Sequence, residues 1–448
     1  MKIARGMNLE QKIGQVLQVD FGAVGHDHIT DENIAINLKL GSLLIGGNGM
    51  PGADGNLVDL PGKDDEERKI YSTATIDKWY KLAQKFNYTI TITTSDNKKY
   101  DIRPLLGTDA VHGNQHVSGT ILFPHNSGLA CSHNPDNFFN AGKWTAEGVK
   151  KSGFNYAFAP TVAVSHNPQW GRFYETMGQE ADEIYKYAKS YTEGIQGKPG
   201  NFTGILGSVK HFYADGATMY GADEGNSLVG SFKSFIYHNT QGYNGSIEAS
   251  IGSVMVSYSA INWIPNAIGA QIGTILRQKL KFDGFVISDY DEMQRVMDQG
   301  LPTNFNIMKS PCDSVTTMLN AGMDMFMLPG WRGMQAVYDV IDGLKNAYNN
   351  KTITEDRLND AVARIIAVKL VLGAANLATS DNLSEEPIQP EERILKLNEA
   401  EYQDSLTAVQ ESLVLLKNTN NVIPFSSSVK YVVLVGEVSQ KINGQGIN

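Results

Sequence analysis

The chain has very little cysteine for its length. Cys131 and Cys312 are the only two cysteines among 448 residues, so a framework of several disulfides is excluded. Long apolar runs are lacking too, and no stretch approaches the ~18 consecutive apolar residues of a membrane-spanning helix. The first residues contain no apolar segment of the kind that secretory signal peptides carry. The sequence therefore predicts a fold built on an ordinary hydrophobic core and leaves the compartment open.

Positive charge is also in short supply. Lys and Arg number 38 against 48 Asp and Glu, which gives a formal net charge of −10 and a pI of about 5.4. An acidic chain of this kind matches neither nucleic acid nor an anionic membrane as its main partner. Hydrophobic residues make up 42% of the sequence, which is enough for a large core.

Short apolar runs alternate with amphipathic stretches along the chain, which is typical of β-α-β units around a parallel sheet. Strands are expected at Gly41–Ile45, Pro104–Thr108, Tyr156–Val162, Ile205–His211, Ser253–Tyr258, Gly284–Asp289 and Met323–Leu328. Helices are expected at Leu9–Val16, Ile76–Lys85, Asp136–Lys150, Glu180–Gln196, Gln271–Leu280, Ser314–Asn320, Met334–Ala347 and Glu355–Val371. This number of units favours an α/β fold of the TIM-like (β/α)8 barrel type over an open doubly wound sheet.

The chain is expected to divide into a barrel, a linker and the start of a second domain. Residues 1–373 should form the barrel, with two insertions at Asn48–Thr73 and at the hairpin-like Thr89–Lys99. Residues 374–399 are polar and are expected to be a linker. Residues 400–448 then predict a helix at Ala400–Lys417 and a strand at Tyr431–Gly436, the start of an incomplete second α/β sandwich domain, because one strand cannot bury a core.

The most informative motif is the run Gly284–Tyr290, in which an apolar strand leads into Ser288, Asp289 and Tyr290. A carboxylate at the carboxyl end of a barrel strand lies where barrel enzymes build their active sites. Asp at such a junction could also simply cap the next helix. The neighbouring motifs are needed to choose between these interpretations.

Several other polar residues share this placement at the carboxyl ends of predicted strands or in the loops after them. They are Asp109, Arg172, Glu175, Lys210, His211, Glu224, Tyr258 and Arg295. Each has an ordinary structural explanation, such as helix capping by Asp109 or an ion pair between Arg172 and Glu175. A barrel brings all strand ends to one mouth, however, and carboxylates beside cations suit the hydroxyls of a sugar. A nucleophilic carboxylate with a second acid about 5–5.5 Å away is the arrangement of retaining glycosidases.

Taken in order, the motifs resemble glycoside hydrolase family 3, in its β-glucosidase and exo-β-glucanase branch. The matching segments are Met7–Gln15, Gly107–Gly113, Tyr156–Pro160, Pro168–Arg172, Lys210–Phe212, Gly284–Tyr290 and Glu411–Asn418. The resemblance implies a retaining, exo-acting hydrolase without a cofactor or metal that releases β-D-glucose from the non-reducing end of β-glucosides or β-glucans. It also makes a secreted, vacuolar or periplasmic location plausible.

The same resemblance implies roles for individual residues. Asp289 is expected to be the nucleophile. The glucose subsite is expected to be lined by Asp109, Arg172, Lys210, His211 and Tyr258, supported by Glu224 and Arg295. Tyr290 stands where family members commonly carry Trp, so the next sugar subsite is expected to differ.

The acid/base group is the weak point of this assignment. In this branch the acid/base group is a Glu of the second domain, beyond the segment that resembles Tyr431–Gly436. We therefore expect it outside this chain, on a complementing domain. A second copy of this chain, in a homo-oligomer, is a further partner to consider. The β-N-acetylglucosaminidase branch instead uses an Asp-His pair in the loop after Lys-His, but residues 212–226 contain no His. Asp215 and Glu224 are the acids of that loop that could substitute.

Three other interpretations remain at this stage. The barrel could bind sugars without turning them over, as the remnant of an enzyme. Lys210 at a strand end could form a Schiff base in a lyase. His112 and His116, four residues apart, could serve a metal hydrolase, although no flanking Glu motif accompanies them.

Overall fold

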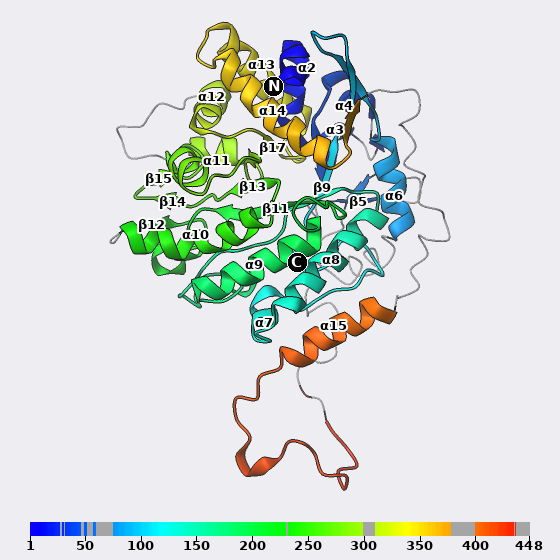
Figure 1. The fold of residues 1–448 in the computed structure, drawn as a ribbon, viewed down its shortest axis with the longest axis vertical. Helices are drawn as coiled ribbons and strands as arrows, with labels where there is room; N and C mark the ends of the chain where they lie inside the picture. Colours follow the sequence, from blue (N-terminus) through cyan, green and yellow to red (C-terminus); the bar gives the residue numbers. More distant parts are fainter. Residues whose placement is uncertain are drawn as a thin grey trace.

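In the computed structural model, residues 1–26, 29–30, 32–45, 49–51, 57–59, 75–229, 232–298, 310–377, 399–433 and 435 are described. Eight strands form one sheet in the order β16-β13-β11-β10-β9-β4-β1-β17. They are β1 (Leu17–Asp20), β4 (Ser42–Ile45), β9 (Leu105–Thr108), β10 (Tyr156–Ala157), β11 (Leu206–Phe212), β13 (Ser253–Val256), β16 (Phe285–Ile287) and β17 (Phe326–Leu328). Every pairing is parallel, and a bridge between Ile287 and Met325 joins the two ends. The predicted TIM-like barrel is confirmed (Figure 1).

The sequence missed one strand of this barrel. β1 follows α2 (Leu9–Gln15) after a single residue, and the helix expected at Leu9–Val16 was followed by no expected strand before Gly41. All four residues of β1 are buried, including the polar Gln18 and Asp20. Gln18 donates a hydrogen bond of 2.7 Å from Nε2 to Oγ of Ser42 on β4, which satisfies that amide N–H inside the barrel. A buried strand with polar residues inside lacks the apolar run that marks such strands in a sequence.

Helices cover the outside of the barrel (Figure 1). They include α6 (Ile76–Lys85), α8 (Pro135–Lys151), α9 (Ala181–Gln196), α10 (Phe232–Glu248), α11 (Glu292–Asp298), α12 (Pro311–Ala321), α13 (Gly333–Asn349) and α14 (Glu355–Val371). All eight predicted barrel helices are found, and the one expected at Gln271–Leu280 is the π-helix η4 (Ile272–Lys279). Helix α10 was not predicted, because its Gly, Asn, Ser and Tyr residues favour helix weakly.

The seam between β16 and β17 is held by one buried acid, Asp324. Its Oδ2 accepts hydrogen bonds from the backbone N of Val286 at 2.8 Å and from Arg277 at 2.7 Å. Its Oδ1 accepts from Arg357 at 2.7 Å. The Asp324 side chain is fully buried, so this carboxylate ties η4 and α14 to the last two strands of the barrel.

The two predicted insertions have different outcomes. β7 (Ile90–Thr93) and β8 (Lys99–Ile102) form the expected antiparallel hairpin, and β18 (Ala375–Leu377) adds a third strand to it. Most of Asn48–Thr73 lies outside the described residues, apart from the antiparallel pair β5 (Gly49–Pro51) and β6 (Leu57–Asp59). Most of the linker expected at residues 374–399 also lies outside them.

The C-terminal part begins with α15 (Glu399–Glu411), which ends earlier than the expected Lys417. It packs on α8, where Trp144 donates a 2.7 Å hydrogen bond to Asp404 and Asn137 a 2.8 Å bond to Glu411. The strand predicted at Tyr431–Gly436 is wrong for residues 431–433 and 435, which are exposed and form no strand. No neighbouring strand in the described part pairs with them, and an isolated strand leaves its backbone groups without partners.

Within the described ranges, no helix combines the length and apolar character needed to cross a bilayer.

Candidate active site

A cavity of about 350 Å³ opens at the carboxyl ends of the barrel strands. Its lining contains seven of the nine predicted site residues, namely Asp109, Arg172, Lys210, His211, Tyr258, Asp289 and Tyr290, together with Leu44, Phe158, Met255 and Met327. Two larger cavities, of about 590 and 770 Å³, are lined by residues that precede the strands, such as Pro104 and Gly284, and by none of the predicted site residues. The predicted residues therefore converge on one small polar cavity at the barrel mouth.

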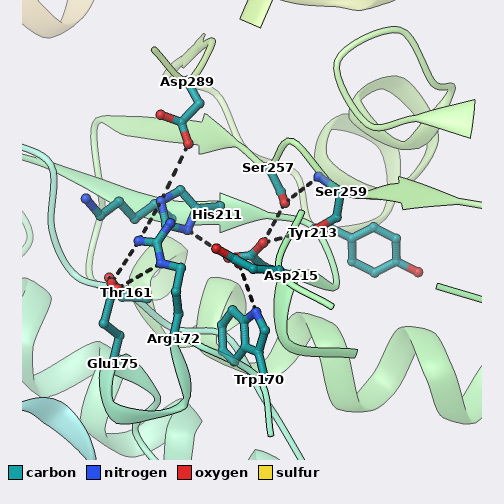
Figure 2. A network of polar contacts seen from close by, with 12 residues as sticks. Thr161, Trp170, Arg172, Glu175, His211, Tyr213, Asp215, Ser257, Ser259 and Asp289 are labelled. Carbon is teal, nitrogen blue, oxygen red and sulfur yellow. Dashed lines mark hydrogen bonds and ion pairs between the residues drawn. The ribbon is translucent and has the colours of Figure 1, made fainter. Parts of the chain in front are cut away.

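Asp289 lies just beyond β16, with its side chain 13% exposed. Its Oδ1 accepts a hydrogen bond of 2.7 Å from the backbone N of Tyr290. Its Oδ2 lies 3.7 Å from Nε2 of His211 (Figure 2). The next helix, α11, starts only at Glu292, two residues beyond the Tyr290 N–H that this carboxylate accepts, so this hydrogen bond is not a cap of that helix. One oxygen is thus fixed by its own loop and the other faces the cavity.

Lys210 and Asp109 form an ion pair inside the cavity. Nζ of Lys210 donates to Oδ1 of Asp109 at 2.8 Å, and the Lys210 side chain is only 6% exposed. Burial would raise the pKa of Asp109, but the charge and hydrogen bond of Lys210 outweigh it, and the pKa lies below its ordinary value. An ammonium held by a carboxylate is poorly placed as a free amine nucleophile, which weakens the Schiff-base interpretation.

Arg172 is held by Glu175 through two hydrogen bonds of 2.8 Å, one from Nε and one from a terminal nitrogen. The ion pair considered from the sequence is thus present, and Arg172 lines the cavity as well. Burial opposes the ionisation of Glu175, but Arg172 outweighs it and lowers the pKa of this carboxyl. The same guanidinium lies 3.3 Å from Nε2 of His211 (Figure 2). Because a guanidinium only donates, Nε2 accepts and the imidazole proton belongs on Nδ1.

Asp215 lies behind His211 and accepts that Nδ1 proton at 2.8 Å. Ser257 and Ser259 donate to its other oxygen at 2.7 and 3.2 Å (Figure 2). Burial would raise the pKa of Asp215, but His211 and its other donors lower it to about 2. Asp215 does not line the cavity. This position argues against the suggestion that Asp215 could replace the acid/base group, because it is a buried, ionised partner of His211.

Glu224 and Arg295, the two remaining predicted residues, lie outside the cavity lining. They form an ion pair with each other, and the Arg295 guanidinium lies 4.0 Å from the centre of the Tyr258 ring. Tyr258 in turn donates a 2.5 Å hydrogen bond to the backbone O of Tyr290. Burial raises the pKa of Glu224, with Arg295 opposing it. The ion pair of Glu224 and Arg295 therefore contacts Tyr258, which lines the cavity.

Two buried acids near the mouth were not predicted. Asp20, at the end of β1, accepts a 3.0 Å hydrogen bond from the hydroxyl of Tyr290, and burial raises its pKa to about 6. It was missed because its strand was missed. Glu292 is fully buried, and neither of its carboxyl oxygens has a hydrogen-bond partner within the described residues. Burial and the charge of Asp289 raise its pKa well above the ordinary value. Only its place three residues after Asp289 could have drawn attention to it.

The histidine pair considered for a metal does not form a metal centre. Nδ1 of His112 lies 2.7 Å from the backbone O of Phe123, and its ring packs on His125 at 4.1 Å. His116 packs instead near Trp79. Across the described residues, no three His, Cys, Asp or Glu side chains gather in a way that could hold a metal ion.

Comparison with known proteins agrees with this architecture. A family model described as the N-terminal domain of glycosyl hydrolase family 3 matches residues 8–368. The chain is 25% identical to a lysosomal beta glucosidase of Dictyostelium discoideum over 97% of its own length and 50% of that protein. It is 28% identical to a periplasmic beta-glucosidase of Salmonella typhimurium over 71% of the chain and 39% of that protein.

Among solved structures, the chain is similar to an exo-1,3/1,4-beta-glucanase from Pseudoalteromonas sp.. The two share 29% identity with a TM-score of 0.75, over 94% of this chain and 47% of the other. The chain thus spans about half the length, or less, of these relatives.

Proposed function

Since the chain belongs to glycosyl hydrolase family 3, we propose that it carries the nucleophile and the glucose subsite of a retaining, exo-acting hydrolase of β-glucosides or β-glucans. The observation that carries this proposal is the position of Asp289 in a cavity of about 350 Å³ whose polar wall is Asp109, Arg172, Lys210 and His211. Barrel side chains such as Leu44 and Met327 complete its lining, and the small volume suits one terminal sugar, which supports exo action.

The mechanism has two steps at the anomeric carbon. An oxygen of Asp289 bonds to that carbon while its bond to the leaving oxygen breaks, and the leaving oxygen takes a proton from an acid. Water then attacks the same carbon, gives its proton to the same group acting as a base, and releases Asp289 as a carboxylate. Two inversions leave the configuration retained. Lys210 and Arg172 are the proposed donors to the sugar hydroxyls, Asp109 is the proposed acceptor, and His211 lines the same wall with its Nε2 unprotonated.

The acid/base group is proposed to come from outside this cavity. Asp109 is the other acid in the lining besides Asp289, and it is paired with Lys210 at 2.8 Å. Asp215 is held behind His211 and stays ionised. We therefore place the acid/base carboxyl on a further domain, as in the family branch that the sequence resembles.

Covalent trapping tests the nucleophile. A 2-deoxy-2-fluoro-β-glucoside with a dinitrophenyl leaving group needs little acid assistance, so it should glucosylate Asp289 in this chain. Mass spectrometry of the intact protein and of its peptides would locate the adduct, and Asp289→Asn is the matched control. An unlabelled Asp289 in a protein with native circular dichroism would refute the assignment. Glucose binding by calorimetry without any label would favour a sugar-binding barrel instead.

A further inference from the structure

The pairing between β16 and the chain at β17 is regular up to Ile287, the last residue of β16. The backbone N of Met325, just ahead of β17, donates to O of Val286 at 3.0 Å, and O of Met325 accepts from N of Ser288 at 3.0 Å. In a parallel ladder, one residue bonds in this way to the two residues that flank its partner, so Met325 lies opposite Ile287. The next bonds are expected two residues further along, at Met327.

The ladder shifts by one residue at Asp289. A regular ladder would join Met327 to the carbonyl of Ser288 and to the N–H of Tyr290. Instead, the backbone N of Met327 donates to the side-chain Oγ of Ser288 at 2.8 Å, and O of Met327 accepts from the backbone N of Asp291 at 3.2 Å. Two residues, Asp289 and Tyr290, therefore lie opposite the single Met327, which is the arrangement of a β-bulge.

The shift gives one backbone donor to the carboxylate of Asp289. In the regular register the N–H of Tyr290 would bond to Met327, but here it donates to Oδ1 of Asp289 at 2.7 Å. The extra residue is accommodated at Asp291, whose φ of 57° lies in the left-handed region and whose side chain is held by Arg332 at 2.8 Å. The bulge therefore fixes Oδ1 of Asp289 and leaves Oδ2 as the oxygen that faces the cavity.

The hydroxyl of Ser288 makes this shift possible. Ser288 is 2% exposed, and its hydroxyl both accepts from N of Met327 and donates to the backbone O of Asp289 at 2.9 Å. The hydroxyl thus replaces the carbonyl of Ser288 in the ladder and also holds the peptide group of Asp289. Without the hydroxyl, the buried N–H of Met327 would lose its acceptor, which is costly. The regular register, in which the carbonyl of Ser288 is the acceptor, would then be favoured.

We propose that Ser288 is a positioning residue for Asp289, because its hydroxyl holds the bulge that turns the N–H of Tyr290 onto the attacking carboxylate. This role rests on the function proposed above. Bulges beside active sites re-aim side chains, and a nucleophile must meet the reacting carbon in a defined geometry. Ser288→Ala removes only the hydroxyl and keeps the rest of the strand end, so it isolates this contribution.

The test is the labelling of Asp289 by the dinitrophenyl 2-deoxy-2-fluoro-β-glucoside, followed over a range of concentrations. Such a series separates the rate constant of labelling at saturation from the concentration that gives half of that rate. Ser288→Ala should lower the rate constant about 10–100-fold, the effect of misplacing a reacting group by about 1 Å, and leave the half-saturating concentration unchanged. Ser288→Thr keeps the hydroxyl and should restore most of the rate. Ser288→Cys, whose thiol is a weak donor and acceptor, should fall between Thr and Ala.

Ser253→Ala provides a matched control on another barrel strand, β13. Ser253 is also fully buried, and its hydroxyl contacts the hydroxyls of Tyr156 at 2.8 Å and Ser208 at 3.0 Å. Ser253 does not line the cavity. Its replacement should lower the thermal stability of the chain and leave both labelling constants unchanged, because it removes buried hydrogen bonds without touching the loop of Asp289.

Equal rate constants in Ser288→Ala and the unaltered chain would overturn the proposal. An equally large loss of rate in Ser253→Ala would overturn it too, because the loss would then follow from stability. If Ser288→Ala does not fold, the Thr and Cys variants decide, and equal rates in these two would contradict the role of the hydroxyl. Failure to label the unaltered chain would instead refute the function proposed for Asp289, whereas normal labelling with an unaffected Ser288→Ala removes only the role of Ser288.

Discussion

At the scale of single residues, side chains that line the cavity are held in place by hydrogen bonds to buried residues behind them. His211 is the clearest case. Its Nδ1 proton goes to Asp215 at 2.8 Å, and its Nε2 is left to face Arg172 and Asp289. A carboxylate behind a histidine sets which ring nitrogen carries the proton, as it does in catalytic triads.

Asp215→Asn should therefore slow the labelling of Asp289 by the fluoroglucoside roughly 100-fold, because an amide can favour the other tautomer of His211. The pKa of Asp215 is lowered from 3.8 to about 2, so its stabilising ionisation is complete above pH 4 and is lost only as the pH falls toward 2. The ratio of labelling rates between the unaltered chain and Asp215→Asn should consequently stay constant between pH 5 and 8. Rates of inactivation across that range measure it.

Ser259→Ala is the control for this substitution, because it removes only a 3.2 Å contact to the same carboxylate. It should cost less than fivefold, the scale of one weak neutral hydrogen bond, about 1 kcal/mol or less. Equal rates in Asp215→Asn and the unaltered chain would show that the orientation of His211 does not matter for glucosyl transfer.

The site residues at strand ends could be predicted from the sequence, but the buried residues that hold them in place could not. Asp109, Lys210 and Asp289 stood out because each lies at or just beyond the carboxyl end of an expected apolar strand. Asp215 was visible too, yet its role depends on Ser257, which lies 42 positions along the chain. Asp20 was invisible as a site residue, because the strand that carries it has two polar positions among four.

At the scale of elements, barrel closure depends on short strands that have few hydrogen bonds of their own. β16 and β17 contain three residues each, and the bridge between Ile287 and Met325 joins them. Asp324 adds three side-chain bonds at this seam, from Val286, Arg277 and Arg357. The alternating strand and helix pattern predicted the barrel, but nothing in it indicated that one acid between two arginines closes the ring.

Asp324→Asn should lower the free energy of unfolding by about 3–5 kcal/mol, because it leaves two largely buried guanidinium groups without their shared carboxylate. Denaturant unfolding followed by circular dichroism measures this loss. Asp360→Asn is the control: Asp360 also contacts Arg357 and Arg364, but its side chain is 45% exposed. The control should cost about 0–1 kcal/mol. Similar losses for both variants would mean that burial of Asp324 adds nothing to the seam.

At the scale of the whole molecule, the described part is one complete barrel with a helix docked on its side. Helix α15 packs on α8, and residues 412–433 extend away from the barrel (Figure 1). Apolar side chains there are well exposed, among them Leu416 at 91% and Tyr431 at 88%. The sequence predicted a strand in this region from its apolar run alone, but a strand needs neighbours that the barrel does not offer.

Under the proposed function the barrel alone would supply half of a two-carboxylate mechanism, which predicts a strong dependence on the leaving group. Dinitrophenyl glucoside, whose leaving group needs no proton, should glucosylate Asp289 readily. This chain should cleave a glucose disaccharide about 10²–10⁴-fold more slowly than an enzyme that has its general acid in place. The second step should also be slow, because the base proposed to activate water lies on a further domain. Azide needs no base, so it should accelerate turnover and yield β-glucosyl azide, which NMR identifies by its retained configuration. Rapid disaccharide cleavage with no response to azide would instead place a working acid/base group within this chain, and Glu224→Gln would then be the first variant to examine.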